Sequence, residues 1–353
     1  MKMRSFKHLR PILRITLWLG VPGLVMAAPP VRNVTFLSTS DVHYRELDHR
    51  FGCNNDLDRA TVVEINRVTE LAWPEQLGPD KIAKPRGVLV LGDLIDDGDR
   101  GEMGRQISAE QYKLFQADFG LDGTDGLLKY PVFEGWGNHD GPPIGKEKNG
   151  FSLQAQIKQR NVIRKEKKLI SNVSENGLHY SWDWDDVHFD QLNIYPADKQ
   201  NAKVHYSPVW HDPQGSLSFL KADLAKNVGA SGRPVVLMAH CGFDTDWWIP
   251  EDWAELYAAM KPYNVVLYLY GHSGTGVSTW APPGEDKQWN CINDGQGTAG
   301  FFVINITGDR LRAAYRLKNG VKFTKAADGK QEHAWDGKWE WKWLVDTRIS
   351  NGK

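Results

Sequence analysis

Five short apolar runs in this sequence are each followed within a few residues by side chains that can bind metal ions. Carboxylates, an amide and imidazoles recur at these positions, and several of them stand beside glycine. The residues concerned are Asp41, His43, Asp93, Asp96, Asn138, His139, Asp140, His240 and His272. Carboxylate ligands favour Mn²⁺ and imidazole suits iron and Zn²⁺, so the set predicts a site for divalent transition-metal ions.

The apolar runs have the length of buried β-strands, and helical patterns lie between several of them. The expected strands are Val34–Ser38, Gly87–Leu91, Pro131–Glu134, Pro234–Ala239 and Val265–Tyr270. The expected helices are Leu57–Leu71, Ala109–Phe119, Phe151–Lys168, Ser216–Asn227 and Glu251–Met260. This alternation predicts an α/β protein, in which ligands bind at the carboxyl ends of parallel strands. If the five strands are parallel neighbours, the candidate ligands meet at one edge of the sheet.

Later parts of the chain follow a different pattern, in which alternating strands are joined by tight turns. His179–Trp184 and Val187–Asn193 flank one turn, and Phe301–Ile306 and Leu311–Leu317 flank another. These hairpins predict a second sheet that packs on the first. We expect one domain over residues 30–325, followed by a tryptophan-rich extension over residues 326–353 that packs on it.

Two groups of tryptophans each allow two interpretations. Trp339, Trp341 and Trp343 alternate with polar residues, so in a strand all three would face one side. They cover the edge of the core, or they bind a ring or a lipid near the site. Trp247 and Trp248 follow His240 closely, and they line the ligand pocket or pack in the core.

Composition excludes several classes of protein. The chain has 353 residues, of which 41% are hydrophobic and 25% are charged, and its formal net charge is −1. These values are typical of a globular protein and argue against a disordered or multispanning chain. The charge balance gives no reason to expect nucleic acid as a structural partner. Cys53, Cys241 and Cys291 allow one disulfide at most, and spacing does not select the pair.

Residues 1–28 have the pattern of a secretory signal peptide. Five basic residues precede or open the apolar stretch Ile15–Met26, and small residues follow it as at a cleavage site. The stretch is shorter than the roughly 20 residues that a membrane span needs. We therefore expect a periplasmic or secreted protein without stable membrane insertion, and an uncleaved anchor is the alternative.

The order of the motifs resembles that of the calcineurin-like metallophosphoesterases over about Val34 to Ile306. The motifs are Asp41-x-His43, Gly92-Asp93-x-x-Asp96, Gly137-Asn138-His139-Asp140, His240 and Gly271-His272. The segments Tyr180–Asp183 and Val187–Phe189 agree with the central hairpin of that family. The resemblance implies two packed mixed β-sheets flanked by helices, and two divalent ions of manganese, iron or zinc.

The resemblance also assigns a role to each position. Asp41 and His43 would bind the first ion, Asp93 would bridge both ions, and Asn138, His240 and His272 would bind the second. His139 would donate a proton to the leaving oxygen, and Asp140 would fix the orientation of His139.

One position departs from the family pattern. The usual Gly-His-x-His motif is Gly271-His272-Ser273-Gly274 in this chain, so a histidine ligand of the first ion is missing. Three interpretations stay open, namely a weaker two-ion site, a ligand from elsewhere, and a binding protein that has lost catalysis. The candidate substitutes are His211, Ser273 and Cys53.

The expected function is that of an exported metal-dependent phosphoesterase, acting on phosphomonoesters above all. A water activated by the two ions would attack the phosphate ester, and His139 would act as general acid. A phosphodiesterase or nuclease at the same site is the first alternative. The second is a secreted, metal-stabilised protein that binds carbohydrate or lipid without catalysis.

Overall fold

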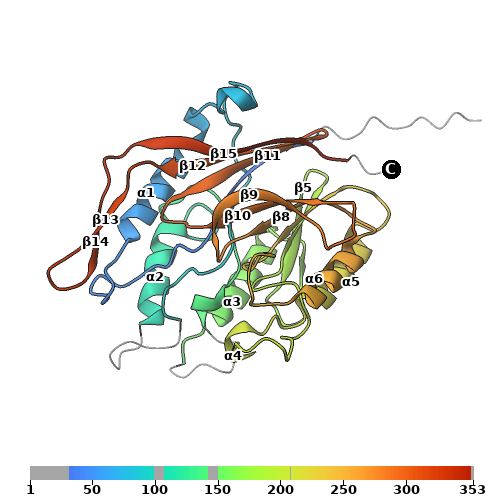
Figure 1. Ribbon diagram of the computed structural model, residues 1–353, viewed down its shortest axis with the longest axis horizontal. Helices are drawn as coiled ribbons and strands as arrows, with labels where there is room; N and C mark the ends of the chain where they lie inside the picture. The colour runs from blue at the N-terminus through green and yellow to red at the C-terminus, as the bar shows by residue number, and fades with distance from the viewer. Residues whose placement is uncertain (1–31, 99–106, 142–149, 207, 351–353) are drawn as a thin grey trace, which may run out of the picture. The chain divides into compact units, whose positions relative to one another are not determined.

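A computed structural model describes residues 32–98, 107–141, 150–206 and 208–350. Two mixed β-sheets lie face to face, and helices cover the outer face of each sheet (Figure 1). The predicted α/β fold of two packed mixed sheets flanked by helices is confirmed. The signal peptide predicted at residues 1–28 lies outside the described residues.

The first sheet contains six strands in the order β15-β12-β11-β1-β2-β3. Their bounds are β1 (Asn33–Thr39), β2 (Val88–Val90), β3 (Val132–Glu134), β11 (Gly300–Thr307), β12 (Arg310–Lys318) and β15 (Trp339–Arg348). β1, β2 and β3 run parallel, and β11 pairs antiparallel with both β1 and β12. Three of the five predicted strands are therefore parallel neighbours.

The second sheet contains seven strands in the order β4-β5-β6-β7-β8-β10-β9. Their bounds are β4 (Asn172–Val173), β5 (Tyr180–Trp184), β6 (Val187–Gln191), β7 (Pro234–Met238), β8 (Asn264–Tyr270), β9 (Gly274–Trp280) and β10 (Trp289–Gly295). β6, β7, β8 and β10 form a parallel set. The remaining two predicted strands, β7 and β8, thus belong to this sheet, and the five do not share one sheet.

The predicted hairpins exist, but they do not form a sheet of their own. The hairpin β5–β6 extends the second sheet through β7, and the hairpin β11–β12 extends the first sheet through β1. The parallel strands of each sheet leave unpaired N–H and C=O groups at their outer edges, and an added hairpin forms hydrogen bonds with the groups of one edge. Both sheets are mixed for this reason.

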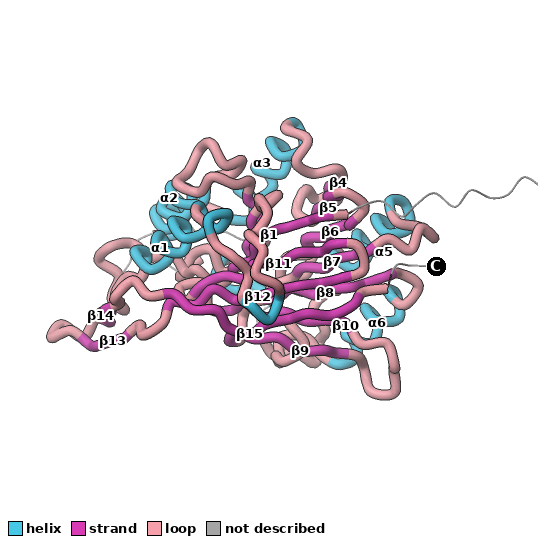
Figure 2. Tube along the Cα trace, turned by 90° about the horizontal axis from the view of Figure 1, so that it is seen from above, coloured by secondary structure: helices cyan, strands magenta, loops and turns pink. Residues whose placement is uncertain are grey.

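All five predicted helices are present on the outer faces of the sheets (Figure 2). The first sheet is covered by α1 (Asn55–Asn66), α2 (Ser108–Phe119) and α3 (Leu153–Glu166), and the second by α5 (Ser216–Asn227) and α6 (Pro250–Met260). A short helix, α4 (Pro208–His211), precedes α5, and a two-stranded hairpin, β13 (Lys322–Lys325) with β14 (Gln331–Ala334), precedes β15.

The core between the sheets is aromatic. Phe36 and Phe133 of the first sheet meet Trp182 and Phe189 of the second, and all four are almost fully buried. The rings of Phe133 and Trp182 stack with 4.3 Å between their centres. Each such side chain contributes about 1.5–3 kcal/mol by leaving water. This packing fixes the two sheets together and so places their carboxyl ends side by side.

The tryptophans of β15 do not share one face. Trp339 and Trp341 pack under the helices on the outer face of the first sheet, whereas Trp343 packs between the sheets. The register of β12 and β15 shifts between Ala313 and Tyr315, and Trp343 has a φ of +46°. Such a bulge reverses the alternation of side chains, so the prediction of a single tryptophan face was wrong. The three side chains cover the edges of the core.

The cysteines Cys53, Cys241 and Cys291 are all free, and the last two are buried. None of the described helices has both the length and the apolar character needed to cross a membrane.

Candidate metal centre

The structure brings the six predicted metal ligands together where the carboxyl ends of the two sheets meet. Asp41, His43 and Asp93 follow strands of the first sheet, and His240 and His272 follow strands of the second. Two contacts join the two groups directly. Nδ1 of His240 lies 3.0 Å from the Leu91 carbonyl oxygen, and the His272 N–H donates to Oδ2 of Asp41 at 3.0 Å.

The backbone at this junction is strained. Asp41, His43, Asp93 and His272 have positive φ angles of 53°, 44°, 51° and 69°. Residues other than glycine rarely adopt this conformation, and it concentrates at functional sites. Hydrogen bonds of 3.0 Å from the Asp41 N–H to Gly92 and from the His43 N–H to Asp93 hold two of these turns. Four ligands are thus placed by backbone that the surrounding structure fixes.

Two glycines of the motifs leave space for candidate ligands that lie against their Cα atoms. A Cβ on Gly92 would lie 2.7 Å from Nδ1 of His240, and Gly92 has a φ of +107°. A Cβ on Gly271 would lie 2.4 Å from Oδ2 of Asp41. Any side chain at either position would therefore push a candidate ligand out of place.

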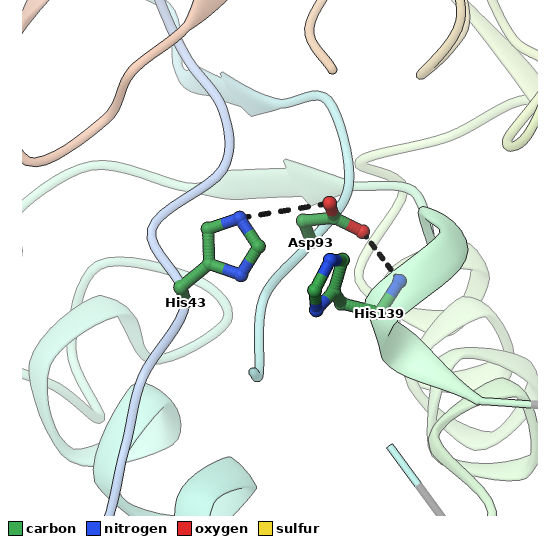
Figure 3. A group of neighbouring side chains, drawn as sticks. All are labelled: His43, Asp93 and His139. Atoms are coloured by element: carbon green, nitrogen blue, oxygen red, sulfur yellow. Dashed lines mark hydrogen bonds and ion pairs between the residues drawn. The ribbon is translucent and has the colours of Figure 1, made fainter. Parts of the chain in front are cut away.

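Asp93 lies at the centre of the site (Figure 3). Its Oδ2 is 3.6 Å from Nε2 of His43 and 3.3 Å from Nε2 of His240. Its other oxygen, Oδ1, accepts the backbone N–H of His139 at 2.8 Å. One carboxylate oxygen of Asp93 therefore lies near imidazoles that follow strands of the two different sheets.

The second cluster is the tighter one. Oδ1 of Asn138 lies 2.9 Å from Nε2 of His240 and 2.9 Å from Nδ1 of His272. Two ligands that bind one ion at about 2.1 Å are about 3.0 Å apart in octahedral geometry and about 3.4 Å apart in tetrahedral geometry. Nδ1 of His240 donates to the Leu91 carbonyl, which can only accept, so Nε2 is the nitrogen left for an ion.

Electrostatics at the site favour a cation. Burial lowers the pKa of His43, but Asp96, Asp93 and Asp41 together raise it to about 9. Burial likewise lowers the pKa of His240, and Asp93 and Asp41 raise it to about 9. Burial raises the pKa of Asp93, yet the neighbouring histidines hold it well below its usual range. The carboxylates thus attract positive charge to a buried place, and the donor set fits divalent transition ions.

The first cluster is looser, and it is the one that would have contained the histidine missing at Gly274. Nε2 of His43 is 3.9 Å from Oδ1 of Asp41. Among the suggested substitutes, Ser273 donates to Asp244 at 2.8 Å and Cys53 lies 3.7 Å from the Arg45 carbonyl oxygen. His211 contacts Trp247, on the side of His272, and its Nδ1 is buried without a hydrogen-bond partner among the described residues. Beside His43 and Asp93, the third potential ligand is His139.

His139 and Asp140 follow β3 in a short helical turn, Asn138–Asp140. The carboxylate of Asp140 accepts the backbone N–H groups of Gly137, Leu94 and Ile95 at 2.7, 2.8 and 3.0 Å. Its carboxylate makes no direct hydrogen bond to the His139 ring, and through Gly137 it holds the turn that carries His139. Adjacent side chains of a helical turn point in different directions. Asp140 also fixes the loop that carries Asp93.

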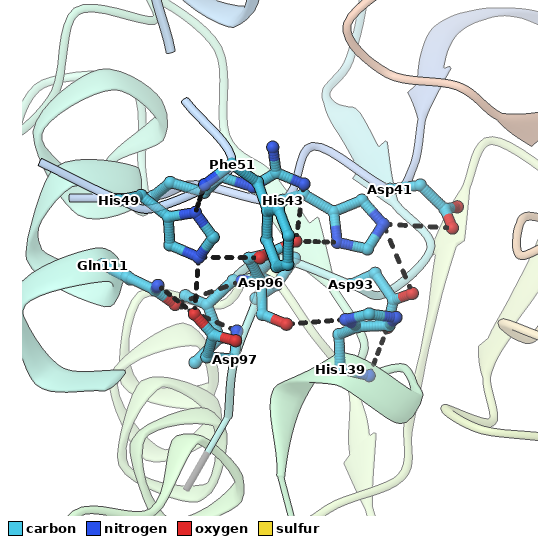
Figure 4. A network of polar contacts seen from close by, with 12 residues as sticks. Asp41, His43, His49, Phe51, Asp93, Asp96, Asp97, Gln111 and His139 are labelled. Atoms are coloured by element: carbon cyan, nitrogen blue, oxygen red, sulfur yellow. Dashed lines mark hydrogen bonds and ion pairs between the residues drawn. The ribbon is translucent and has the colours of Figure 1, made fainter. Parts of the chain in front are cut away.

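Asp96 contacts the rings of both His139 and His43. Its carbonyl oxygen lies 2.6 Å from Nδ1 of His139, and its carboxylate lies 3.3 Å from Nδ1 of His43. Figure 4 shows these contacts as part of a network that extends to His49 and Asp97. The motif spacing contained Asp96, but it gave no sign that one residue would contact two histidines.

The two adjacent tryptophans have different roles. Trp248 is buried and donates its indole N–H to the Gly242 carbonyl at 2.7 Å, which is core packing. Trp247 is half-buried, and its ring meets that of His272 edge to face with 4.8 Å between centres. Only Trp247 therefore lies at the candidate site.

Comparisons with known proteins agree with this geometry. Residues 34–275 match the family model described as calcineurin-like phosphoesterase. The structure resembles that of PhoD with a TM-score of 0.51 and 12% identity, covering 91% of this chain and 71% of that one. This likeness shows a shared fold.

Two other solved structures are less similar to this chain. The protein TT1561 of Thermus thermophilus has a TM-score of 0.39 and 12% identity, over 86% of this chain and 99% of that one. Phosphopantetheinyl hydrolase from Mycobacterium tuberculosis has a TM-score of 0.35 and 12% identity, over 75% and 91% of the two chains. No curated protein matches the chain.

Proposed function

The chain belongs to the calcineurin-like phosphoesterase family, and we propose that it hydrolyses phosphomonoesters at a centre of two divalent ions. The observation that carries this proposal is the position of Asp93. Its Oδ2 lies 3.6 Å from Nε2 of His43 and 3.3 Å from Nε2 of His240, between two separate groups of ligands.

Each group of residues would hold one ion. Asp41, His43 and Asp93 would bind the first ion, and Asp93, Asn138, His240 and His272 the second. When bound, the ions supply Lewis-acid stabilisation of the phosphate oxygens and an activated water. The residues of the chain hold these positions before substrate arrives, because strained backbone and fixed tautomers leave them few other conformations.

His139 is suited to protonate the leaving oxygen. Its Nδ1 must carry hydrogen, because the partner at 2.6 Å is the carbonyl oxygen of Asp96, which can only accept. A second proton is therefore held on Nε2 in the cationic form, and this is the proton available for transfer. The His139 and His43 rings meet edge to face at 4.6 Å, so this proton lies beside the candidate centre.

The charge of the ligand set supports a phosphomonoester. Of the six proposed ligands, only Asp41 and Asp93 are carboxylates, and the amide and the three imidazoles would be neutral when they bind an ion. Two divalent ions would bring four positive charges against these two negative ones. The excess positive charge complements a dianionic monoester better than a monoanionic diester.

A substrate comparison tests the proposal. The purified protein is stripped of metal, reloaded with Mn²⁺, iron, Zn²⁺ or Mg²⁺, and assayed with p-nitrophenyl phosphate and its bis-ester. We expect hydrolysis of the monoester to exceed that of the diester with at least one transition ion. Preference for the diester would instead establish a phosphodiesterase or nuclease. Inactivity of protein that retains its metal would support the binding protein without catalysis.

We also propose that the protein is exported, on the ground of the basic and apolar pattern of residues 1–28. The full-length chain, expressed in a bacterial host, should appear in the periplasm or medium with those residues removed. A variant that lacks residues 2–28 should stay in the cytoplasm. Full-length protein that keeps residues 1–28 and remains in the membrane fraction would identify an uncleaved anchor.

A further inference from the structure

A second group of metal-binding side chains lies away from the candidate centre, on the outer face of the second sheet. His188 and Asp190 are two residues apart on β6 and share that face, and Asp223 approaches them from α5. All three side chains are buried, and their potential ligand atoms lie within 4.8 Å of one another. Apolar residues normally occupy such a helix–sheet contact, so this cluster requires an explanation.

The group is distinct from the phosphoesterase centre. His188 pairs with Val235 on β7, and His240 follows the far end of that strand. Five residues of extended chain correspond to about 16 Å along the strand direction. An ion at His188 could therefore not share ligands with the ions beside Asp93.

The spacing of the three side chains suits a single ion. Nε2 of His188 is 2.7 Å from Oδ2 of Asp223 and 3.3 Å from Oδ2 of Asp190. Ligands that bind one ion at about 2.1 Å are about 3.0 Å apart in octahedral geometry and about 3.4 Å apart in tetrahedral geometry. The longer separation already fits, and the shorter one would have to widen by about 0.3–0.7 Å.

Surrounding residues hold two of the three ligands in the required orientation. Nδ1 of His188 lies 2.7 Å from Oδ1 of Asp183, directly across from it on β5, which leaves Nε2 to face Asp190 and Asp223. Oδ1 of Asp223 accepts hydrogen bonds from Asn172, Ser181 and Asn227 at 2.5, 2.6 and 2.8 Å, so Oδ2 remains for the cluster. A carboxylate behind a histidine and donors behind a carboxylate are typical of metal sites.

Asp190 supplies independent support for a ligand. Its side chain is fully buried, yet neither carboxylate oxygen receives a hydrogen bond from the described residues. The nearby Nε2 of His188 can donate at most one hydrogen, and Asp223 lies closer to it. Buried carboxylates without donors are rare, because their burial is strongly unfavourable. Three carboxylates, those of Asp183, Asp190 and Asp223, meet here with one permanent cation, Arg233, 3.0 Å from Asp183. With a neutral His188 as ligand, two negative charges would remain to balance a divalent ion.

We propose that His188, Asp190 and Asp223 bind a divalent transition ion such as Zn²⁺ or Mn²⁺ that ties α5 to the hairpin β5–β6. Asp223 also lines a surface cavity of about 590 Å³, so the cluster lies one side chain away from this cavity. The ion would have a structural role, because no residue of the cluster belongs to the phosphoesterase centre. The inference does not depend on the proposed function.

Diffraction and metal analysis test the proposal on the full-length wild-type protein. Crystals soaked with Zn²⁺, with data collected above the zinc absorption edge, should show anomalous density between His188, Asp190 and Asp223. Density at the Asp93 centre without density at this cluster would overturn the proposal, and this test needs no variant to fold.

Two matched variants provide the second test. Asp190→Asn should lose about one equivalent of bound metal and keep the kcat of the wild type. Glu175→Gln, the same type of change at an exposed residue lining the same cavity, should keep both. If the cluster instead holds a protonated His188 and no ion, Asp190→Asn should have the metal content of the wild type. This result would refute the site.

Discussion

Replacement of His139 by alanine separates two roles that the structure allows for this residue. Its ring lies beside His43 and Asp93 and could either protonate the leaving group or serve as the missing ligand of the first ion. The backbone N–H that binds Oδ1 of Asp93 is unchanged in the variant. The bridge itself should therefore stay in place, and we expect His139→Ala to retain both ions.

The expected kinetic effect follows from general acid catalysis. Loss of the proton donor should reduce kcat for alkyl phosphates by about 10²–10⁴-fold. At 1.36 kcal/mol for each factor of ten, this reduction corresponds to a barrier higher by about 2.7–5.4 kcal/mol. With p-nitrophenyl phosphate, whose leaving group needs little protonation, the loss should fall below about tenfold.

The assay combines kcat for the two substrates with metal content by mass spectrometry. His333→Ala, the same substitution on the hairpin β13–β14, is the control and should resemble the wild type. Loss of about one metal equivalent in His139→Ala would show that His139 is a ligand of the first ion. Equal reductions of kcat for both substrates with full metal content would refute the acid role.

Three further predictions concern the bridge, the incomplete site and the support of β3. Asp93→Asn should lose metal from both clusters and reduce kcat by more than about 100-fold, with an unchanged circular dichroism spectrum, and full metal content would contradict the bridge. Metal titration of the stripped wild-type protein should show one tight and one weak class, with activity following the weak class, because Gly274 supplies no ligand; two equally tight classes would reveal an unseen donor. Glu134→Gln should lower the free energy of unfolding by about 3 kcal/mol, measured in urea, because Glu134 is buried between Arg160 and Arg164. Burial raises the pKa of Glu134, but the two arginines lower it by more, so the folded-state pKa is below that of an unfolded glutamate. The stabilisation that ionised Glu134 supplies is therefore complete above the pKa of an unfolded glutamate, and it is lost as the pH falls through the folded-state pKa. The exposed Glu70→Gln should change stability little, and an equal effect of both substitutions would refute this account.

Local pattern was sufficient to predict five strands, five helices and two hairpins, and it placed the candidate ligands after strand ends. The helix Ser216–Asn227 begins and ends where its periodicity indicated, and each proposed ligand lies within five residues of a strand end. Strand pairing was less accessible, because an apolar run has the same appearance whichever sheet it joins. The separation of β7 and β8 from β1 depends on contacts between distant segments, and the sequence does not display these contacts.

The contacts of single side chains could not be predicted from the sequence either. Asp140 stands next to His139 in the chain, yet its carboxylate binds the loop around Leu94. Trp343 changes face because of a bulge, which is set by the pairing of β15 with β12. In both cases spacing alone did not predict the contact, because the backbone there leaves regular geometry.

The two ion sites should differ in strength, and the difference can be traced to Gly274. Oδ1 of Asn138 lies 2.9 Å from each of two imidazole nitrogens in the second cluster, whereas the distances from His43 to Asp93 and Asp41 in the first are 3.6 and 3.9 Å. Gly274 has a φ of +71°, and no atom lies within 4 Å of a Cβ built there. Open space alone would admit a histidine, but the left-handed backbone opposes one by about 1 kcal/mol or more. Asp41, His43, Asp93 and His272 hold positive φ angles at the same site, so this strain does not exclude a side chain. Gly274→His should therefore lower the stability by about 1 kcal/mol or more and tighten the weaker class of ion.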